Sequence, residues 1–154
     1  MDQKELVILS QFRQNARENL TTTSRKIRIP ISTIYDRLRR YEGNVIKKYT
    51  TLLDFGKLGY NLKVQIVLKV ALKSKAALQN FLNHHSRVNS LFLLSNDYDF
   101  LLEGIFRDIK EVSDFAQALE KFSIIDKHEF YVVDDIKRED FLTNSALYDL
   151  ETFK

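Results

Sequence analysis

Residues 31–42 combine hydroxyl, carboxylate and guanidinium side chains in a segment whose apolar spacing predicts a helix. The predicted apolar side consists of Ile31, Ile34, Leu38 and Tyr41. The polar side consists of Ser32, Thr33, Asp36, Arg39 and Arg40, and the two flanks are Tyr35 and Arg37. These are the groups that read base edges and bind phosphates in the major groove of DNA. A solvated polar face on an ordinary amphipathic helix is the alternative interpretation.

The segments around this helix favour the DNA-binding interpretation. A first helix buries a broad stripe around Leu9 and Phe12, and Asn19 is suited to cap a second, short helix that reaches residue 27. Three residues, 28–30, then lead into the polar helix, with Pro30 at its first turn. Two short helices joined in this way predict a helix-turn-helix.

The residues after the polar helix predict a β wing. Gly43 and Asn44 form a turn signal, and residues 45–53 read as an extended strand. The wing would bring Lys47 and Lys48 to the DNA backbone. The first residues of a recognition helix usually contact bases, which makes Ser32, Thr33, Tyr35 and Asp36 the predicted readers. The predicted phosphate contacts are Arg37, Arg39, Arg40, Lys47 and Lys48.

The 154-residue chain has a net charge of +3 that is divided unevenly. Residues 1–61 hold 12 Lys and Arg against six Asp and Glu, whereas residues 62–154 hold 12 against 15. A basic first part predicts that this part alone meets a polyanion. The chain has no cysteine, no apolar run near 18 residues and no signal peptide pattern, so we expect a cytoplasmic protein.

The second part of the chain predicts a βαββαβ order, which is typical of a ferredoxin-like sandwich. Residues 63–72 alternate strictly between apolar and polar, and Ser74 is suited to cap the helix that follows. Strands are then predicted at 88–94 and 98–106, and Asp108 with Glu111 forms a capping box for the second helix. The last strand is predicted at 129–133.

One layer of helices leaves the other sheet face uncovered, and that face is predicted to be apolar. Its predicted members are Val67, Leu91, Leu93, Leu101, Ile105, Tyr131 and Val133. An exposed apolar patch of this size marks an interface, and a second copy packing with two-fold symmetry is the simplest partner. We therefore expect a homodimer.

Several motifs resemble the Lrp/AsnC family of transcription regulators. They include Asn15-Ala16-Arg17, Arg37-Leu38-Arg39-Arg40, and the run from Leu53 to Tyr60. The resemblance implies a winged helix-turn-helix followed by a ferredoxin-like effector domain that dimerises through its sheet and assembles further. The chain departs from the family pattern at three positions of the DNA-binding part. Arg28 replaces the turn glycine, Pro30 replaces a serine, and Thr23 replaces a leucine.

The stretch from Leu94 to Leu102 is similar to the most recognisable motif of the family's effector domain, with Asn96 where a glycine is usual. The resemblance implies that amino acids or other small effectors bind near this turn. Asp97 or Asp99 would pair with an ammonium group, and turn amides would receive a carboxylate. Alternatively, Asp99 only satisfies turn amides and Asp97 is solvated. Because of Asn96, the hypothesis is that this turn serves as an oligomer contact, with amino-acid binding weak, altered or absent.

These patterns predict four segments along the chain. Residues 1–52 form the winged helix-turn-helix, 53–61 a linker, 62–137 the effector and dimerisation domain, and 138–154 a C-terminal arm. The arm packs back on its own domain or contacts another copy.

Two other functional classes share this layout. An architectural DNA-binding protein would use the same parts without an operator or an effector. Sirohaem decarboxylases resemble these regulators, but the chain has no tryptophan and reads Ser90-Leu91-Phe92-Leu93-Leu94 where their His-Asn-Tyr-Leu-Arg-like run is expected. His84 and His85 are adjacent, which does not suit a metal-binding pair on one helix face. We expect no enzyme activity, no metal and no cofactor.

Overall fold

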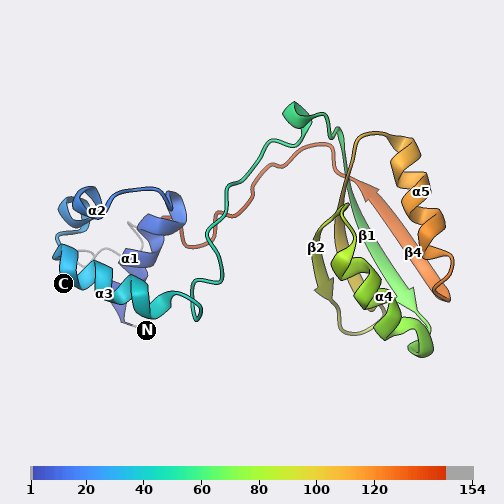
Figure 1. The fold of residues 1–154 in the computed structure, drawn as a ribbon, viewed down its shortest axis with the longest axis horizontal. Coiled ribbons are helices and arrows are strands. Elements are labelled where there is room, and N and C mark those ends of the chain that lie inside the picture. The colour runs from blue at the N-terminus through green and yellow to red at the C-terminus, as the bar shows by residue number, and fades with distance from the viewer. Residues whose placement is uncertain (1, 145–154) are drawn as a thin grey trace. The chain divides into compact units, whose positions relative to one another are not determined.

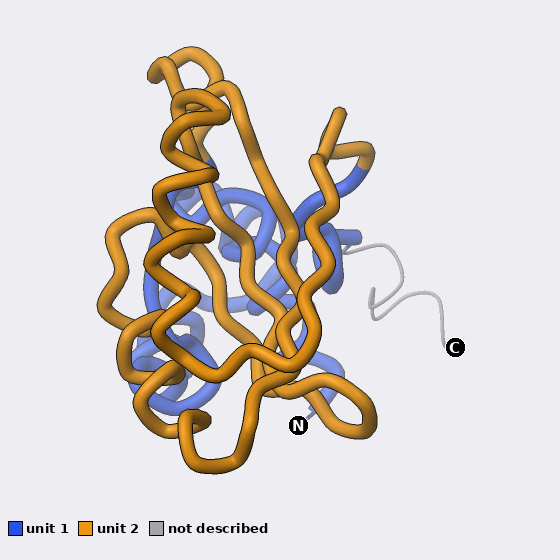
Figure 2. The backbone as a smooth tube through the Cα atoms, turned by 90° about the vertical axis from the view of Figure 1, so that its right-hand side faces the viewer, with its two compact units in different colours: residues 1–52, 137–154 blue, residues 53–136 orange. Residues whose placement is uncertain are grey.

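The computed structural model describes residues 2–144, which form two compact units (Figure 2). Of the described residues, 2–52 and 137–144 form unit 1, and 53–136 form unit 2. Most of the predicted C-terminal arm, residues 145–154, lies outside the described residues. Within residues 2–144, no helix is long and apolar enough to cross a membrane.

Unit 1 is built from three helices, α1 (Gln3–Gln14), α2 (Leu20–Ile27) and α3 (Ile31–Tyr41), as Figure 1 shows. Asn19 caps α2, as the sequence predicts, because its Oδ1 accepts a hydrogen bond of 2.8 Å from the backbone N–H of Thr22. The core joins Ile8 of α1 to Ile34 of α3, and both side chains are fully buried. Ile31 does not belong to this core, since 43% of it is exposed at the first turn of α3.

The predicted wing strand is not formed. Residues 47–53 carry no strand, and only an isolated bridge between Glu42 and Ile46 closes the turn after α3. The turn of residues 42–46 is closed on itself and on the end of α3, since the N–H of Ile46 bonds to the carbonyl of Tyr41 at 2.9 Å and the N–H of Gly43 bonds to the carbonyl of Ile46 at 3.1 Å. Among the described residues, no strand pairs with residues 47–53, so their backbone has no ladder to join.

Unit 2 is a four-stranded antiparallel sheet with two helices on one face, the predicted ferredoxin-like sandwich (Figure 1). The strand order is β2-β3-β1-β4. The strands are β1 (Leu62–Val70), β2 (Val88–Leu93), β3 (Phe100–Phe106) and β4 (Ile124–Tyr131), and the helices are α4 (Leu72–His84) and α5 (Ile109–Leu119). The linker contains a short 3-10 turn, η1 (Gly56–Leu58).

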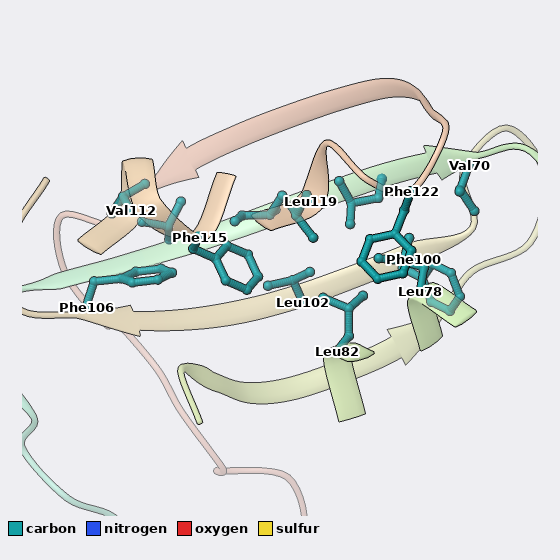
Figure 3. Close-up of a cluster of buried hydrophobic side chains, with 13 residues drawn as sticks. Val70, Leu78, Leu82, Phe100, Leu102, Phe106, Val112, Phe115, Leu119 and Phe122 are labelled. Atoms are coloured by element: carbon teal, nitrogen blue, oxygen red, sulfur yellow. The ribbon is translucent and has the colours of Figure 1, made fainter. Parts of the chain in front are cut away.

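The core of unit 2 lies between the helices and one sheet face (Figure 3). Alternate residues of β1 enter it, with Val64, Ile66 and Leu68 almost fully buried. Phe106 of β3 and Phe115 of α5 meet with ring centroids 5.6 Å apart. Burying these large side chains is the main stabilising contribution in the unit.

Several predicted element ends in unit 2 are wrong. Helix α4 begins at Leu72 and is capped by Ala71 without a side-chain bond, so Ser74 is not its cap and Leu72 is 87% exposed. Strand β4 begins at Ile124, earlier than the predicted residue 129. For α5, Asp108 does accept from the N–H of Glu111. The Glu111 carboxylate, however, accepts from the N–H of Arg107 and not from the cap residue, so the box is shifted by one position.

The strand register corrects the membership of the open sheet face, which is the face without helices. Residues directly opposed in antiparallel strands point to the same side. Leu91 and Leu93 oppose Leu102 and Phe100, and Tyr131 opposes Val64, so these three predicted members lie on the helix side. Val133 lies beyond β4 and is fully exposed. The apolar side chains of the open face on the four strands are Val67, Phe92, Leu101, Ile105 and Phe130.

Candidate nucleic-acid interface

Helix α3 presents an exposed polar face. Ile34 and Leu38 fix the helix in the core of unit 1, and its hydrophobic side is therefore used for packing. On the outer side Ser32, Tyr35, Asp36, Arg39 and Arg40 are exposed and Thr33 is partly exposed. The N-cap, Pro30, makes no side-chain bond, so the first turn of α3 is left with free backbone N–H groups beside the predicted reading residues.

The turn between α2 and α3 depends on an unusual backbone conformation. Arg28 occupies the left-handed region with φ 54° and ψ 38°, at the position where the family pattern has glycine. Ile29 follows and is buried, and its carbonyl accepts a 2.6 Å bond from the hydroxyl of Ser24. The helix-turn-helix geometry is therefore kept without the glycine, at a cost in backbone strain.

Arg37 is not placed as a phosphate contact. Its Nη1 donates to both carboxylate oxygens of Asp2 at 3.0 and 3.1 Å, and its Nη2 donates to Oδ2 at 3.1 Å. Glu5 lies 3.7 Å away, and only 17% of the Arg37 side chain is exposed. The hydrogen bonds to Asp2 raise the pKa of Arg37 and lower that of Asp2. Arg37 thus joins α3 to the start of α1.

Asp2 has a second role that the sequence analysis missed. Its Oδ1 accepts from the N–H of Glu5 at 2.7 Å, and its own N–H donates to Glu5 Oε2 at 2.7 Å, which is a complete capping box for α1. The spacing of Asp2 and Glu5 was the available signal. The link to Arg37, 35 residues away, had no local signal.

The other basic residues point to solvent. The guanidinium carbon of Arg39 lies 5.7 Å from the Tyr35 ring centroid, a cation–π contact that orders both side chains on the outer face. Arg40 makes only a long bond, 3.4 Å, to the carbonyl of Asp36. Lys47 and Lys48 are exposed just after the Glu42–Ile46 bridge. Arg39 and Arg40 thus lie on the exposed face of α3, and Lys47 and Lys48 follow the turn after α3 in the chain.

The chain after β4 returns to unit 1, which neither predicted role of the arm anticipates. The Arg13 guanidinium pairs with Glu139, and its Nε donates to the carbonyl of Phe141 at 3.3 Å. Gln14 bonds to the carbonyl of Thr143, and Leu142 packs against the helical core. The last described residues therefore hold the end of α1.

The predicted effector turn is shaped by its own contacts. Asn96 is left-handed with φ 72°, as a residue in place of glycine has to be. The Asp99 carboxylate accepts 2.6 Å from Lys75 Nζ and 2.9 Å from the N–H of Val70, and the Lys75 bond lowers its pKa. Asp97 is exposed. Asp99 is thus engaged in holding the turn to the rest of unit 2, and Asp97 is the carboxylate that faces solvent.

Curated relatives match more than nine tenths of this chain, whereas no family profile matches it. An uncharacterised HTH-type transcriptional regulator of Pyrococcus furiosus is 25% identical over 142 residues, covering 92% of this chain and 96% of the relative. The glutamate uptake regulatory protein of Zymomonas mobilis is 25% identical over 147 residues, covering 92% and 90%.

Solved structures of similar fold match about nine tenths of this chain. LrpC of Bacillus subtilis superposes with a TM-score of 0.81 at 18% identity, over 89% of this chain and 97% of LrpC. A Neisseria meningitidis transcriptional regulator, solved as an L-Met complex, gives 0.81 at 22% identity, over 90% and 93%.

A helix-turn-helix with an exposed polar third helix, joined to a ferredoxin-like unit, is the layout of a class of two-unit proteins that includes DNA-binding regulators. Within that class, the chain has the fold of Lrp/AsnC transcriptional regulators, and its curated relatives are HTH-type transcriptional regulators.

Proposed function

We propose that this chain is a sequence-specific, DNA-binding transcription regulator and that α3 is its recognition helix. The exposed polar face of α3 carries the proposal, since its opposite side is committed to the core of unit 1. The relatives named as transcriptional regulators support it. DNA binding rather than catalysis is the proposed activity.

The side chains of the interface divide into two roles. Ser32, Thr33, Tyr35 and Asp36 lie in the first turns of α3 and are the proposed readers of base edges. Arg39, Arg40, Lys47 and Lys48 are the proposed phosphate contacts. Arg37 does not belong to the proposed phosphate contacts, because its guanidinium is held by Asp2. It acts instead as a positioning residue for α3.

We further propose a homodimer that forms through the open sheet face. Phe92 and Phe130 are more than half exposed there, and Val67 and Leu101 lie between them on the central strands. Ile105, near the end of β3, is only 8% exposed and is therefore left out of the proposed interface. Large apolar side chains gathered on one uncovered face are typical of an interface. Two-fold pairing would give two recognition helices for two half-sites about one helical turn of DNA apart.

The effector is proposed to be a small molecule, in line with the L-Met complex of the Neisseria meningitidis protein and the name of the Zymomonas mobilis relative. At the turn of residues 95–99, Asp99 is engaged by Lys75, which leaves Asp97 to receive an ammonium group. Because Asp99 is engaged and Asn96 stands where a glycine is usual, we propose that this turn serves mainly as an oligomer contact and binds amino acids weakly or not at all.

Selection of bound sequences from a random pool of duplex DNA tests the proposed function. The full chain is expected to enrich an inverted repeat, and Thr33→Ala is expected to change the enriched bases. A sequence-selective footprint at the enriched site would support the regulator. Uniform protection without enrichment would support the architectural alternative instead and overturn the proposed operator recognition.

A further inference from the structure

A second cluster of cationic and aromatic side chains lies in unit 2, where β2 begins and β3 ends. Tyr60 reaches it from the linker, just after η1 and the left-handed Gly59, whose φ of 84° suits a residue without a side chain. The guanidinium carbons of Arg87 and Arg107 lie 5.4 and 5.2 Å from the centroid of the Tyr60 ring. One phenol ring thus has two cations against it.

The two arginines are held in place by their neighbours. Arg87 Nη2 donates to Glu111 Oε1 at 2.5 Å, and the N–H of Arg107 donates to Glu111 Oε2 at 2.9 Å. The carbonyl of Arg87 accepts from the N–H of Ile105 at 2.9 Å. Hydrogen bonds from both guanidiniums lower the pKa of Tyr60. Both guanidiniums lie against Tyr60, and that of Arg87 is paired with Glu111. The cluster therefore carries a positive excess, and its side chains are already positioned.

A cavity of about 260 Å³ adjoins the cluster. Part of its wall is apolar, and Leu58 in that wall is more than half exposed. The residues that line it are Phe55, Leu58, Tyr60, Ser86, Arg87, Val88, Asn89 and Ile105. The lining therefore combines an apolar wall with cationic and hydroxyl groups, and none of these eight residues carries a carboxylate.

We propose that this cavity binds a small organic carboxylate with a short apolar tail, such as a branched 2-oxo acid. The carboxylate would lie against the Tyr60–Arg87 side, where charge-assisted hydrogen bonds are available, and the tail would cover the apolar wall. The volume lies below the roughly 300–1,000 Å³ of pockets for drug-sized ligands, which limits the occupant to a small metabolite. The inference rests on the proposed function only for the ligand's role as an effector.

The charge pattern distinguishes this ligand from two related ones. An amino acid would bring an ammonium group, yet none of the eight lining residues carries a carboxylate. The two carboxylates nearby are already bonded, Glu111 to Arg87 and Glu103 to Asn89. Inorganic phosphate would satisfy the cations and leave the apolar wall uncovered. A 2-oxo acid matches both parts of the site.

Titration of the isotope-labelled full chain with 4-methyl-2-oxopentanoate, L-leucine and inorganic phosphate tests the proposal by NMR. We expect saturable shifts of the amide signals of Tyr60, Ser86 and Asn89 with the oxo acid. Binding of leucine and of phosphate is expected to be at least about tenfold weaker, since each lacks one matched interaction.

Variants locate the site. Arg107→Gln removes one cation from Tyr60, and Tyr60→Phe removes only the hydroxyl and keeps the ring. Each is expected to weaken the oxo acid about tenfold. Lys110→Gln is the matched control, because Lys110 lies at the start of α5, close to Arg107 in the chain, but pairs with Asp114 outside the cluster. Its affinity is expected to be unchanged, and the dispersion of each spectrum reports whether the variant is folded.

The outcomes separate the two proposals. An absence of saturable shifts up to about 10 mM oxo acid, or unchanged binding in folded Tyr60→Phe and Arg107→Gln, would overturn the site. Leucine binding as tightly as the oxo acid would overturn the ligand class. DNA affinity is measured on the same samples without ligand. Loss of DNA recognition with the oxo acid still bound would thus count against the proposed function alone.

Discussion

Arg37 of α3 and Asp2 at the start of α1 are joined by three hydrogen bonds of 3.0 to 3.1 Å between guanidinium and carboxylate. Asp2 simultaneously caps α1. One carboxylate therefore fixes both the beginning of the first helix and the flank of the third. Together with the buried Ile34 and Leu38, this link positions the proposed reading residues of α3.

Arg37→Ala and Arg40→Ala should reduce DNA binding in different ways. Arg40→Ala is expected to flatten the plot of log affinity against log salt by about 0.9, because one phosphate contact and its released counterion are lost. Arg37→Ala should lower the melting temperature and weaken binding with the salt slope kept. Fluorescence anisotropy at several salt concentrations measures both. A flattened slope for Arg37→Ala would restore it as a phosphate contact.

The Arg37–Asp2 link should also make unit 1 sensitive to acid. The pKa of Asp2 is lower in the folded chain, mainly through its bond to Arg37, so its contribution is complete above the unfolded value of about 4. The contribution is lost as the pH falls through the folded pKa. Asp2→Asn keeps a good capping residue but removes the charge.

Urea unfolding from pH 6 to pH 3, followed through the amide signals of α1, measures this effect. Asp2→Asn is expected to be less stable than the wild type at pH 6 and to converge with it at the acid end. Asp97→Asn is the control because Asp97 is an exposed carboxylate in unit 2. A constant difference between Asp2→Asn and the wild type at every pH would contradict the assigned role.

Arg28→Gly is expected to stabilise unit 1 by about 1 kcal/mol. Arg28 adopts a left-handed conformation that is costly for a residue with a β carbon and easy for glycine. Thermal unfolding of the two proteins measures the gain. Asn96→Gly, at φ 72°, is the comparison and should gain less, since asparagine tolerates this region better. Destabilisation by Arg28→Gly would mean that contacts of the arginine side chain outweigh the strain.

Leu101→Arg should abolish the proposed dimer. Leu101 opposes Val67 in the middle of the open face, and an arginine there would be buried without a partner when two copies pack. Leu93→Arg is the matched control, because Leu93 is 65% exposed and opposes Phe100 on the helix side. Sedimentation should give a monomer for the first variant and the wild-type species for the second. A monomeric wild type at micromolar concentration would overturn the proposed dimer.

The sequence was sufficient where the controlling interactions are local. Asn19 caps α2 through the next turn, and the strict alternation of β1 puts Val64, Ile66 and Leu68 in the core. The faces of the other strands depend on features that a pattern does not contain. An irregularity between Val88 and Ser90 shifts β2 by one residue, which moves Leu91 to the opposite side of the sheet from the one predicted.

In the candidate DNA interface, too, the sequence predicts the features that local periodicity controls and misses those that distant partners control. The exposed face of α3 follows from helical periodicity, and so do the positions of Ser32, Thr33 and Arg40 on it. Arg37 has the composition of a phosphate contact, and only the three-dimensional position of Asp2 assigns it to packing. Partners far apart in sequence set the role of a long cationic side chain, and no local pattern reports them.

The pairing of Arg13 with Glu139 spans 126 residues of chain. Because a polypeptide is made from its N-terminus, α1 emerges from the ribosome long before the segment that holds its end, and the whole of unit 2 is synthesised in between. The helix-turn-helix therefore reaches its final form only after translation has passed the last strand. A chain cut short by premature termination would contain every residue of α3 and still lack part of the unit that supports it.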